Sequence, residues 1–171
     1  MYNCIYDCRY CFLQGMYSSA NYVLFVNYDD FFKAISDTID KNTDTSLTFF
    51  SGYDCDSLAF EKITGFAEKA LEFFTNFSSV ELELRTKSIV SETLLKRSPI
   101  SNCIVAYSLS PSNLAGVLDN KAPSIERRVN ALKTLAKNGW TVGLRFDPLI
   151  YCSGWENLYS ELIQDIFTDI N

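Results

Sequence analysis

The sequence predicts an α/β fold in which parallel strands are joined by outer helices. Apolar runs with a period of two alternate with runs of helical period, at about 30 residues per strand–helix unit. The chain has 171 residues, of which 47% are apolar and 21% charged, as expected of one globular domain. Strands joined in this way run parallel through right-handed crossovers, and ligands bind at their carboxyl ends.

The first expected elements are a short strand, a helix and a second strand. Tyr22–Val26 is a short apolar run typical of a strand, and Asn27 then caps a helix over Tyr28–Asp40. Three apolar residues define the inward face of this helix: Phe31, Phe32 and Ile35. Ser46–Ser51 is the second strand, and it ends at Gly52.

The middle of the chain repeats this order. Phe60–Phe77 has helical spacing, and Ser78 stops that helix before the alternating strand Val80–Thr86. The inward positions of the helix are Ile63, Phe66, Ala67, Ala70, Leu71 and Phe74. Ser91–Lys96 is a short helix, which ends before Pro99.

The next segment contains two strands and one helix. Cys103–Leu109 and Thr141–Phe146 are the strands, and Pro111–Gly116 is expected to be a loop. Ile125–Asn138 is a helix because its apolar residues recur on one face and Gly139 follows in the usual C-terminal position.

The two ends of the chain leave the predicted sheet incomplete. The chain opens on a cysteine-rich loop with no strand before it, and it closes on the amphipathic helix Trp155–Phe167 with no strand after it. Such a sheet has an unpaired edge on each side, which a complete domain normally covers. We therefore expect residues 1–171 to be one piece of a larger domain that lacks its first and last strands here.

Composition excludes several functional classes. The chain has no histidine, which removes catalytic triads, cysteine–histidine pairs and histidine-bound zinc. The net charge of −6 provides no global field that attracts nucleic acid, so DNA binding requires a local patch. No apolar run approaches the roughly 20 residues of a membrane span, and no signal peptide opens the chain. We expect a cytoplasmic protein that does not contact a membrane.

Three of the six cysteines cluster near the start of the chain. Cys4, Cys8 and Cys11 are spaced by four and three residues, so one short loop can turn all three thiols toward a common centre. A 4Fe–4S cluster is normally held by four cysteines, and three would leave one iron open. The alternatives are a zinc site with a remote fourth cysteine, or three unrelated buried thiols. No second Cys-x-x-Cys pair supports structural zinc.

The spacing C-x3-C-x2-C, with Tyr10 just before the last cysteine, resembles the signature of the radical S-adenosylmethionine enzymes. The resemblance implies a partial (β/α)6 barrel whose first strand leads into the cysteine loop. It also implies that Cys4, Cys8 and Cys11 ligate a 4Fe–4S cluster whose open iron binds S-adenosylmethionine. A reducing partner such as flavodoxin or ferredoxin would then drive cleavage to a 5′-deoxyadenosyl radical.

Within that superfamily the chain resembles the spore photoproduct lyase family, whose members reverse a thymine–thymine adduct in DNA. The likeness extends over nearly all residues, in motifs that include Cys11-Phe12-Leu13-Gln14, Leu84-Arg85-Thr86-Lys87, Tyr107-Ser108-Leu109, Glu126-Arg127-Arg128, Asn138-Gly139-Trp140 and Gly154-Trp155-Glu156. It implies a lyase in DNA repair. The alternatives are a radical enzyme that acts on a substrate other than DNA, and a metal-binding remnant without catalysis.

The resemblance also assigns binding residues to the cofactor. Lys87 would pair with the carboxylate of S-adenosylmethionine, and Ser108 would hydrogen-bond the same moiety. Ser51 and Gly52 would lie beside its amino group, and Tyr10 is a candidate for both binding and catalysis. A solvated surface charge is the alternative for Lys87, and a plain strand-ending turn is the alternative for Gly52.

Two positions depart from the family pattern. Family members return a hydrogen atom to the substrate from a cysteine after the second strand, through a tyrosine that follows the third cluster cysteine. Here Tyr53 stands at the cysteine position, with Cys55 two residues later, and Phe12 replaces the tyrosine. Cys55 and Tyr53 remain the candidate hydrogen donors, and a buried inert thiol is the alternative for Cys55.

Two further predictions concern side chains outside this site. Cys103 and Cys152 are expected to be inert because their surroundings are apolar. Four cations recur along the helix after residue 124, where they favour a solvated face over a DNA-binding one: Arg127, Arg128, Lys133 and Lys137.

Overall fold

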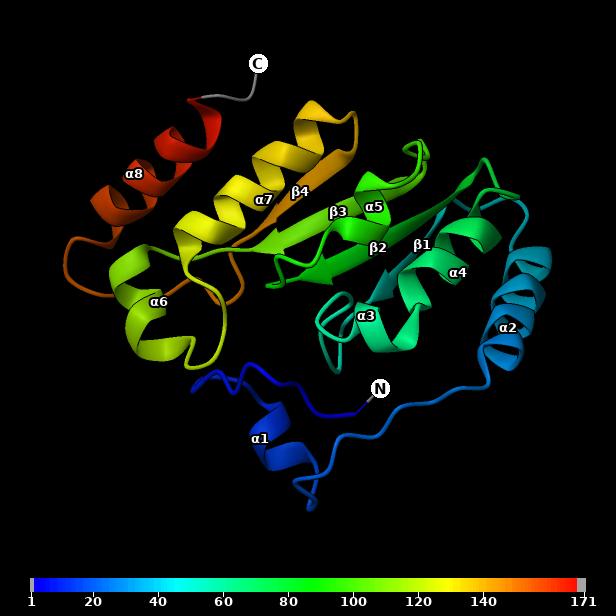
Figure 1. Ribbon diagram of the computed structural model, residues 1–171, viewed down its shortest axis with the longest axis horizontal. Helices are drawn as coiled ribbons and strands as arrows, with labels where there is room; N and C mark the ends of the chain where they lie inside the picture. The colour runs from blue at the N-terminus through cyan, green and yellow to red at the C-terminus, as the bar shows by residue number, and fades with distance from the viewer. Residues whose placement is uncertain (1, 169–171) are drawn as a thin grey trace.

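The computed structural model describes residues 2–168, and its centre is a parallel four-stranded sheet. The strands lie side by side in chain order: β1 (Leu47–Ser51), β2 (Val80–Thr86), β3 (Cys103–Ser108) and β4 (Thr141–Arg145). All three neighbouring pairs are parallel, so every strand presents its carboxyl end at the same edge (Figure 1). This arrangement confirms the predicted α/β class and four of the expected strands.

Eight helices are described between residues 2 and 168. They are α1 (Leu13–Met16), α2 (Tyr28–Lys41), α3 (Glu61–Thr64), α4 (Phe66–Phe74), α5 (Glu92–Leu95), α6 (Ser112–Leu118), α7 (Ile125–Lys137) and α8 (Trp155–Phe167). Helices α4, α5 and α7 lie on one face of the sheet, while α1 and the cysteine loop lie beyond the carboxyl ends of the strands (Figure 1). The site edge of the sheet is therefore closed by the amino-terminal segment.

The two faces of the sheet differ in chemistry because successive strand residues point to opposite sides. Leu82, Leu84 and Val105 face the helices and are fully buried in the core. Two residues of the opposite face, Glu83 and Arg85, alternate with them along β2 and form an ion pair. We call this second side of the sheet the inner face.

Tyr22–Val26 is not a strand, contrary to expectation. Within the described chain its one sheet-like contact is an isolated antiparallel bridge between Val23 and Tyr2, with N–O distances of 2.9 and 3.3 Å. The apolar character of the run has another cause, since its Phe25 ring packs against Tyr2 and Phe31. Phe31 accordingly points away from the core and is about half exposed, whereas Phe32 packs on the core as predicted.

Two further elements differ from expectation. The helix expected over Phe60–Phe77 is divided into α3 and α4 at Gly65, whose φ of 56° lies in the left-handed region. This break turns Ile63 outward, where it is 75% exposed. The expected loop Pro111–Gly116 is instead largely helix α6, because Pro111 lies just before its first turn, where proline is tolerated.

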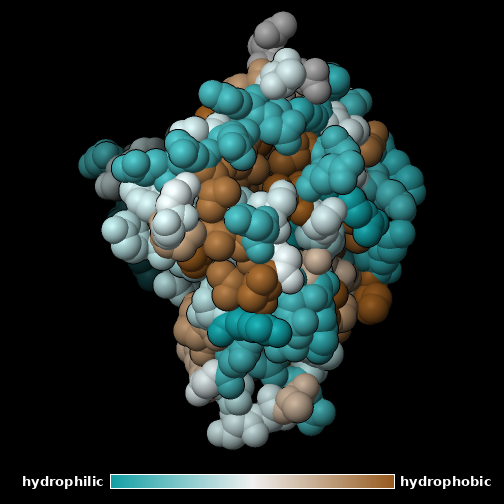
Figure 2. Space-filling model, turned by 90° about the vertical axis from the view of Figure 1, so that its left-hand side faces the viewer, coloured by the Kyte–Doolittle hydropathy of each residue, from teal (hydrophilic) through white to brown (hydrophobic). Residues whose placement is uncertain are grey.

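The outer strands have one neighbour each among the residues that the structure describes. Beside β4, α8 and the loop before it expose apolar side chains, including Leu149 and Ile163. Figure 2 shows hydrophobic residues in the middle of this side of the molecule, with hydrophilic residues above and below. No helix within residues 2–168 has the length and apolar composition needed to cross a bilayer.

We expect Gly52→Ala to destabilise the protein strongly. Gly52 has a φ of 82°, and an added Cβ would lie 2.6 Å from the Ser57 hydroxyl oxygen and 2.7 Å from the Arg85 carbonyl oxygen. Left-handed strain and overpacking together predict a loss of about 3 kcal/mol in the free energy of unfolding.

Urea unfolding would measure this loss, with Gly65→Ala as the matched control. Gly65 also has positive φ, but a Cβ there would meet no atom within 4 Å, so only about 1 kcal/mol should be lost. Equal losses in the two variants would show that the close contacts at Gly52 are unimportant.

Candidate functional site

A cavity of about 740 Å³ lies where the cysteine loop meets the carboxyl ends of the strands. Its lining includes residues from the loop and from the carboxyl end of each strand or the segment just after it, among them Cys4, Gly52, Lys87, Ser108 and Asp147. These residues are far apart in the sequence, and the parallel sheet brings them to one edge. A cavity is therefore present at the carboxyl ends of the strands, where the sequence predicts the site.

The cysteine loop turns sharply on residues in unusual backbone conformations. Asn3 and Asp7 have φ angles of 65° and 52°, and both residue types tolerate this region better than most. The loop is tied to α1 through Cys8, whose carbonyl oxygen accepts hydrogen bonds from the Cys11 N–H at 3.0 Å and the Gln14 amide at 2.6 Å. These contacts hold the second and third cysteines in one compact turn.

All three cysteines of the loop line the same cavity. Burial raises the pKa of Cys4 to about 12 and that of Cys8 to about 11, so both thiols are protonated at neutral pH. Within residues 2–168, no three His, Cys, Asp or Glu side chains are arranged to hold a single metal ion. Cys4 and Cys8 are therefore neutral thiols that border the same space as Cys11.

Tyr10 and Lys87 meet at one corner of this cavity. The Lys87 Nζ atom lies 5.4 Å from the centre of the Tyr10 ring, and its charge lowers the pKa of Asp119 and opposes the burial that raises the pKa of Cys8. Lys87 is half-buried and lines the cavity, so it is not a plain solvated surface charge.

A buried ion pair anchors this corner. The Tyr10 hydroxyl donates to Asp119 Oδ1 at 2.5 Å, and Arg128 Nη1 lies 2.7 Å from Asp119 Oδ2. Burial alone would raise the pKa of Asp119, but the Tyr10 hydrogen bond and the charges of Lys87 and Arg128 outweigh it and lower that pKa. Arg128 also donates to the Ser108 carbonyl oxygen at 3.1 Å, which joins the pair to the end of β3.

Main-chain contacts also join the cysteine loop to the segment around Asp119. Cys8 and Asp119 form an isolated antiparallel bridge, and the Arg9 N–H donates to the Leu118 carbonyl oxygen at 2.8 Å. The segment between α6 and α7 therefore holds the cysteine loop over the sheet through main-chain and side-chain contacts together.

Arg128 corrects one sequence expectation. It is 1% exposed, and Lys133 is 9% exposed, so the cations of α7 do not all lie on a solvated face. Arg128 falls on the apolar stripe of its helix, next to Val129 and four residues before Leu132. The position of a charged residue among the apolar residues of α7 is the sequence signal that could have predicted a buried ion pair, here with Asp119.

Asp56 is a second residue that sequence reasoning missed. Its buried carboxylate accepts hydrogen bonds from the Leu58 and Ala59 N–H groups at 3.0 and 2.9 Å. It also accepts from the Thr86 hydroxyl at 2.7 Å and the Lys87 N–H at 2.6 Å. Burial raises the pKa of Asp56 although these four bonds oppose the shift. The carboxylate fixes the backbone from which the Lys87 side chain projects.

The remaining predicted binding residues have different surroundings. Ser108 is buried and lines the cavity at the end of β3. Gly52 lines it at the end of β1, and its close neighbours are Ser57 and the Arg85 backbone. Ser51, at the end of β1, is not among the described residues that line the cavity, and its hydroxyl accepts a hydrogen bond from Ser57 at 3.1 Å.

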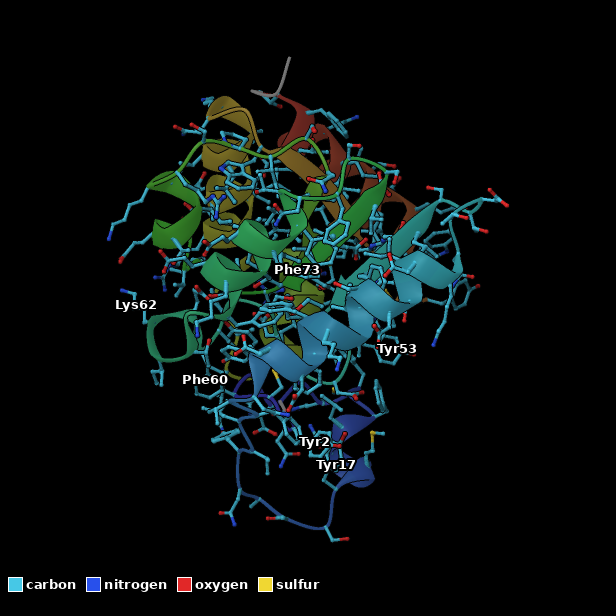
Figure 3. All side chains as sticks on the ribbon, turned by 90° about the vertical axis from the view of Figure 1, so that its right-hand side faces the viewer. Tyr2, Tyr17, Tyr53, Phe60, Lys62 and Phe73 are labelled. Carbon is cyan, nitrogen blue, oxygen red and sulfur yellow. The ribbon has the colours of Figure 1, made fainter. Side chains whose placement is uncertain are left out.

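The candidate hydrogen donors lie on the loop after β1. Tyr53 is 69% exposed and its ring centre lies 6.2 Å from that of Phe12, at the mouth of the cavity. Figure 3 shows Tyr53 above the stacked pair Tyr2 and Tyr17, whose ring centres are 4.6 Å apart. Cys55 is half-buried in the cavity wall, and burial raises its pKa to about 11.

The two remaining cysteines lie outside the cavity lining. Cys103 is fully buried in β3, as its apolar surroundings predicted, whereas Cys152 is half-buried. All six cysteines are free thiols.

Comparison with known proteins extends these observations. The family model described as spore photoproduct lyase matches residues 2–171. A spore photoproduct lyase from a Geobacillus strain is 26% identical over 95% of this chain, and one from Clostridium acetobutylicum is 22% identical over 94%. The chain spans about half the length of the curated relatives it matches, 48% in both cases.

Solved structures share the fold. A spore photoproduct lyase variant with dinucleoside spore photoproduct aligns with a TM-score of 0.90 at 23% identity, over 99% of this chain and 51% of that one. A second variant, with bound AdoMet and dinucleoside spore photoproduct, aligns with a TM-score of 0.90 at 24% identity, over 98% and 51%. These matches confirm the expected architecture, a partial barrel of parallel strands with outer helices.

Arg128→Met should destabilise the protein by about 3 to 5 kcal/mol, because it leaves the Asp119 carboxylate buried without its cation. Denaturant unfolding would measure the loss. Arg127→Met is the matched control, since Arg127 is exposed on the same helix and should change stability by less than about 0.5 kcal/mol. Similar values for both variants would contradict the importance of the buried pair.

Proposed function

The chain belongs to the spore photoproduct lyase family, and we propose that it binds a 4Fe–4S cluster and S-adenosylmethionine in the cavity at the strand ends. The observation that carries this proposal is that three thiols of one loop line a single cavity together with Lys87. When bound, the reduced cluster would supply the electron that cleaves S-adenosylmethionine to a 5′-deoxyadenosyl radical.

The donor set suits such a cluster. Three cysteines that ligate one cube bind three different iron atoms, so their sulfurs need not converge as the ligands of a single ion do. The loop supports this reading because Cys4, Cys8 and Cys11 surround shared space and do not form a single-ion site among the described residues. Three ligands leave the fourth iron free for the cofactor.

Lys87 and Ser108 suit the amino-acid end of S-adenosylmethionine. The Lys87 ammonium lies beside the cysteine loop and would pair with the cofactor carboxylate. The Ser108 side chain at the end of β3 can hydrogen-bond the same group, and Gly52 offers backbone on the opposite side. Tyr10 holds this corner through Asp119, which makes it a positioning residue in this proposal. Ser51 accepts a hydrogen bond from Ser57, which lies against Gly52, so its proposed role is to position the end of β1 beside the cofactor.

The proposed substrate is a thymine lesion in DNA, as the name of the relatives suggests. The cavity is large enough for more than a cofactor, and its mouth carries the exposed rings of Phe12 and Tyr53. Exposed aromatic rings provide stacking surfaces for nucleobases, and such stacking does not depend on the net charge of the protein.

The proposed electron donor is a flavodoxin or ferredoxin. The proposed location is the reducing cytoplasm, which suits six free thiols.

Cys55 is the proposed source of the returned hydrogen atom. Its thiol lies in the cavity wall near Cys4, whereas the Tyr53 ring is mostly exposed at the mouth. The substrate carbon radical would take the hydrogen of the S–H bond, and the thiyl radical left behind would regain an electron and a proton through the reducing partner. Phe12 has no hydroxyl hydrogen, so it contributes packing and no relay.

Anaerobic loading with iron and sulfide tests the cluster. We expect about four iron atoms per parent chain and release of 5′-deoxyadenosine after addition of dithionite and S-adenosylmethionine. Cys8→Ser should lose both, while Cys152→Ser, a half-buried cysteine outside the cavity, should keep both. Full iron content and product release in Cys8→Ser would overturn the ligand assignment.

Repair of spore photoproduct in D2O tests the hydrogen donor. A thiol exchanges its proton with solvent, so we expect one deuterium in the methyl group of the repaired thymine, detected by mass spectrometry. Cys55→Ala should lower the rate of repair at least about tenfold, which corresponds to 1.4 kcal/mol in the barrier. Tyr53→Phe should repair at a rate near that of the parent. The opposite ranking would assign the donor role to the Tyr53 phenol.

A further inference from the structure

The inner face of the sheet carries two guanidinium groups around one buried carboxylate. Glu83 of β2 is 1% exposed, and its carboxylate accepts hydrogen bonds from Arg145 Nε at 3.1 Å and Arg145 Nη2. Arg85 Nε donates to Glu83 Oε1 at 3.2 Å. Two cations therefore share one anion on the face that no described helix covers (Figure 1).

The strand register shows why both arginines can reach Glu83. Arg145 of β4 is level with Ser108 of β3, whereas Glu83 of β2 is level with Ile104. The Arg145 side chain must therefore cross β3 near Ala106, a small residue that is fully buried. Gly143 leaves further room, because a Cβ there would lie 3.1 to 3.2 Å from Ile104 and Ala106. Small residues thus form a trough in which the guanidinium lies.

The network leaves hydrogen-bond donors available. Among the described residues, the Arg85 guanidinium makes one hydrogen bond, through Nε, and its Nη1 atom lies 3.6 Å from Asp147 Oδ2. The Asp147 side chain is 73% exposed and well solvated, so it screens Arg85 weakly. Arg145 still has Nη1, and its side chain is 39% exposed. Glu83 therefore holds both guanidinium groups in place, and the donors left for a ligand are Nη1 and Nη2 of Arg85 and Nη1 of Arg145.

The two arginines lie differently relative to the proposed reaction site: Arg85 lines the cavity, and Arg145 is paired in register with Ser108, which also lines it. Arg85 and Asp147 line the same cavity as Lys87 and the cysteine loop. Planar guanidinium forks match phosphate oxygens in bidentate geometry, and pre-positioned forks lose little entropy on binding. Lys87 meets the needs of the cofactor carboxylate in the proposed function, so the arginine pair has no assigned ligand.

We propose that Arg85 and Arg145, held by Glu83, bind the phosphodiester that joins the two nucleosides of the lesion. This inference rests on the proposed function, because it takes a dinucleotide lesion as substrate. The phosphodiester links the two sugars of the lesion, and Arg85 belongs to both the cavity lining and the inner face, so a lesion held in the cavity can present this group to Arg85. With the phosphodiester bound by the two guanidinium groups at the inner face, the damaged bases would extend into the cavity.

Binding of two lesion ligands to the cluster-loaded protein tests the inference. One ligand is the dinucleotide spore photoproduct, which has the bridging phosphate, and the other is the dinucleoside, which lacks it. Calorimetry with S-adenosylmethionine present should show about tenfold tighter binding of the dinucleotide by the parent. Arg145→Gln and Arg85→Gln should abolish this preference and leave affinity for the dinucleoside within about twofold.

Two further variants separate this role from folding and from general charge. The double variant Glu83→Gln with Arg145→Gln removes Arg145 together with the buried carboxylate, leaves Arg85 with Asp147 as its remaining ion-pair partner at 3.6 Å, and should also lose the preference. Arg127→Gln removes one positive charge from an exposed position on α7 and should keep the preference.

The possible failures are distinguishable. If the parent binds both ligands equally, or if the arginine variants weaken both ligands equally, the phosphate assignment is wrong while the proposed function stands. If the parent binds neither ligand, both proposals fall. If Arg85→Gln instead weakens binding of S-adenosylmethionine measured without a lesion ligand, Arg85 belongs to the cofactor and the inference is overturned.

Discussion

The contact between Asp119 and Arg128 is the constraint on which the site depends. It joins α7 to the segment after α6, and Tyr10 extends it to the cysteine loop. Burial of Tyr6 and Leu13 helps to attach the cysteine loop, and polar contacts with the sheet layer set the position of its thiols. The buried pair supplies that position, and the hydrogen bond from Arg128 to the Ser108 carbonyl oxygen connects it to the strand end.

Much of the fold could be predicted from the sequence, because period-two and period-3.6 patterns determine which faces are buried. The strands β1 to β4 and the helices α2, α7 and α8 follow such patterns. The strand prediction for Tyr22–Val26 was wrong because an apolar run can also arise from packing against aromatic rings, as Phe25 does here. Strand pairing also depends on a partner strand that the local sequence does not reveal. Gly65 divided a helix that periodicity alone would continue.

The candidate site was predictable where its residues lie close together in the chain. The three cysteines and Tyr10 occupy one short loop, and Lys87 follows a strong strand pattern. Asp56, Asp119 and Arg128 were not predictable as a group, because their roles depend on contacts between distant segments. Arg128 was assigned to a solvated face, although its place on the apolar stripe of α7 conflicted with that assignment.

The high pKa values of Cys4 and Cys8 affect the reactivity of these two thiols. A thiol reacts with oxidants and metals mainly as its thiolate, so buried neutral thiols resist air oxidation better than exposed ones. In the proposed function each of these thiols would release its proton on becoming an iron ligand, so cluster assembly would release protons and would proceed more readily in mild alkali.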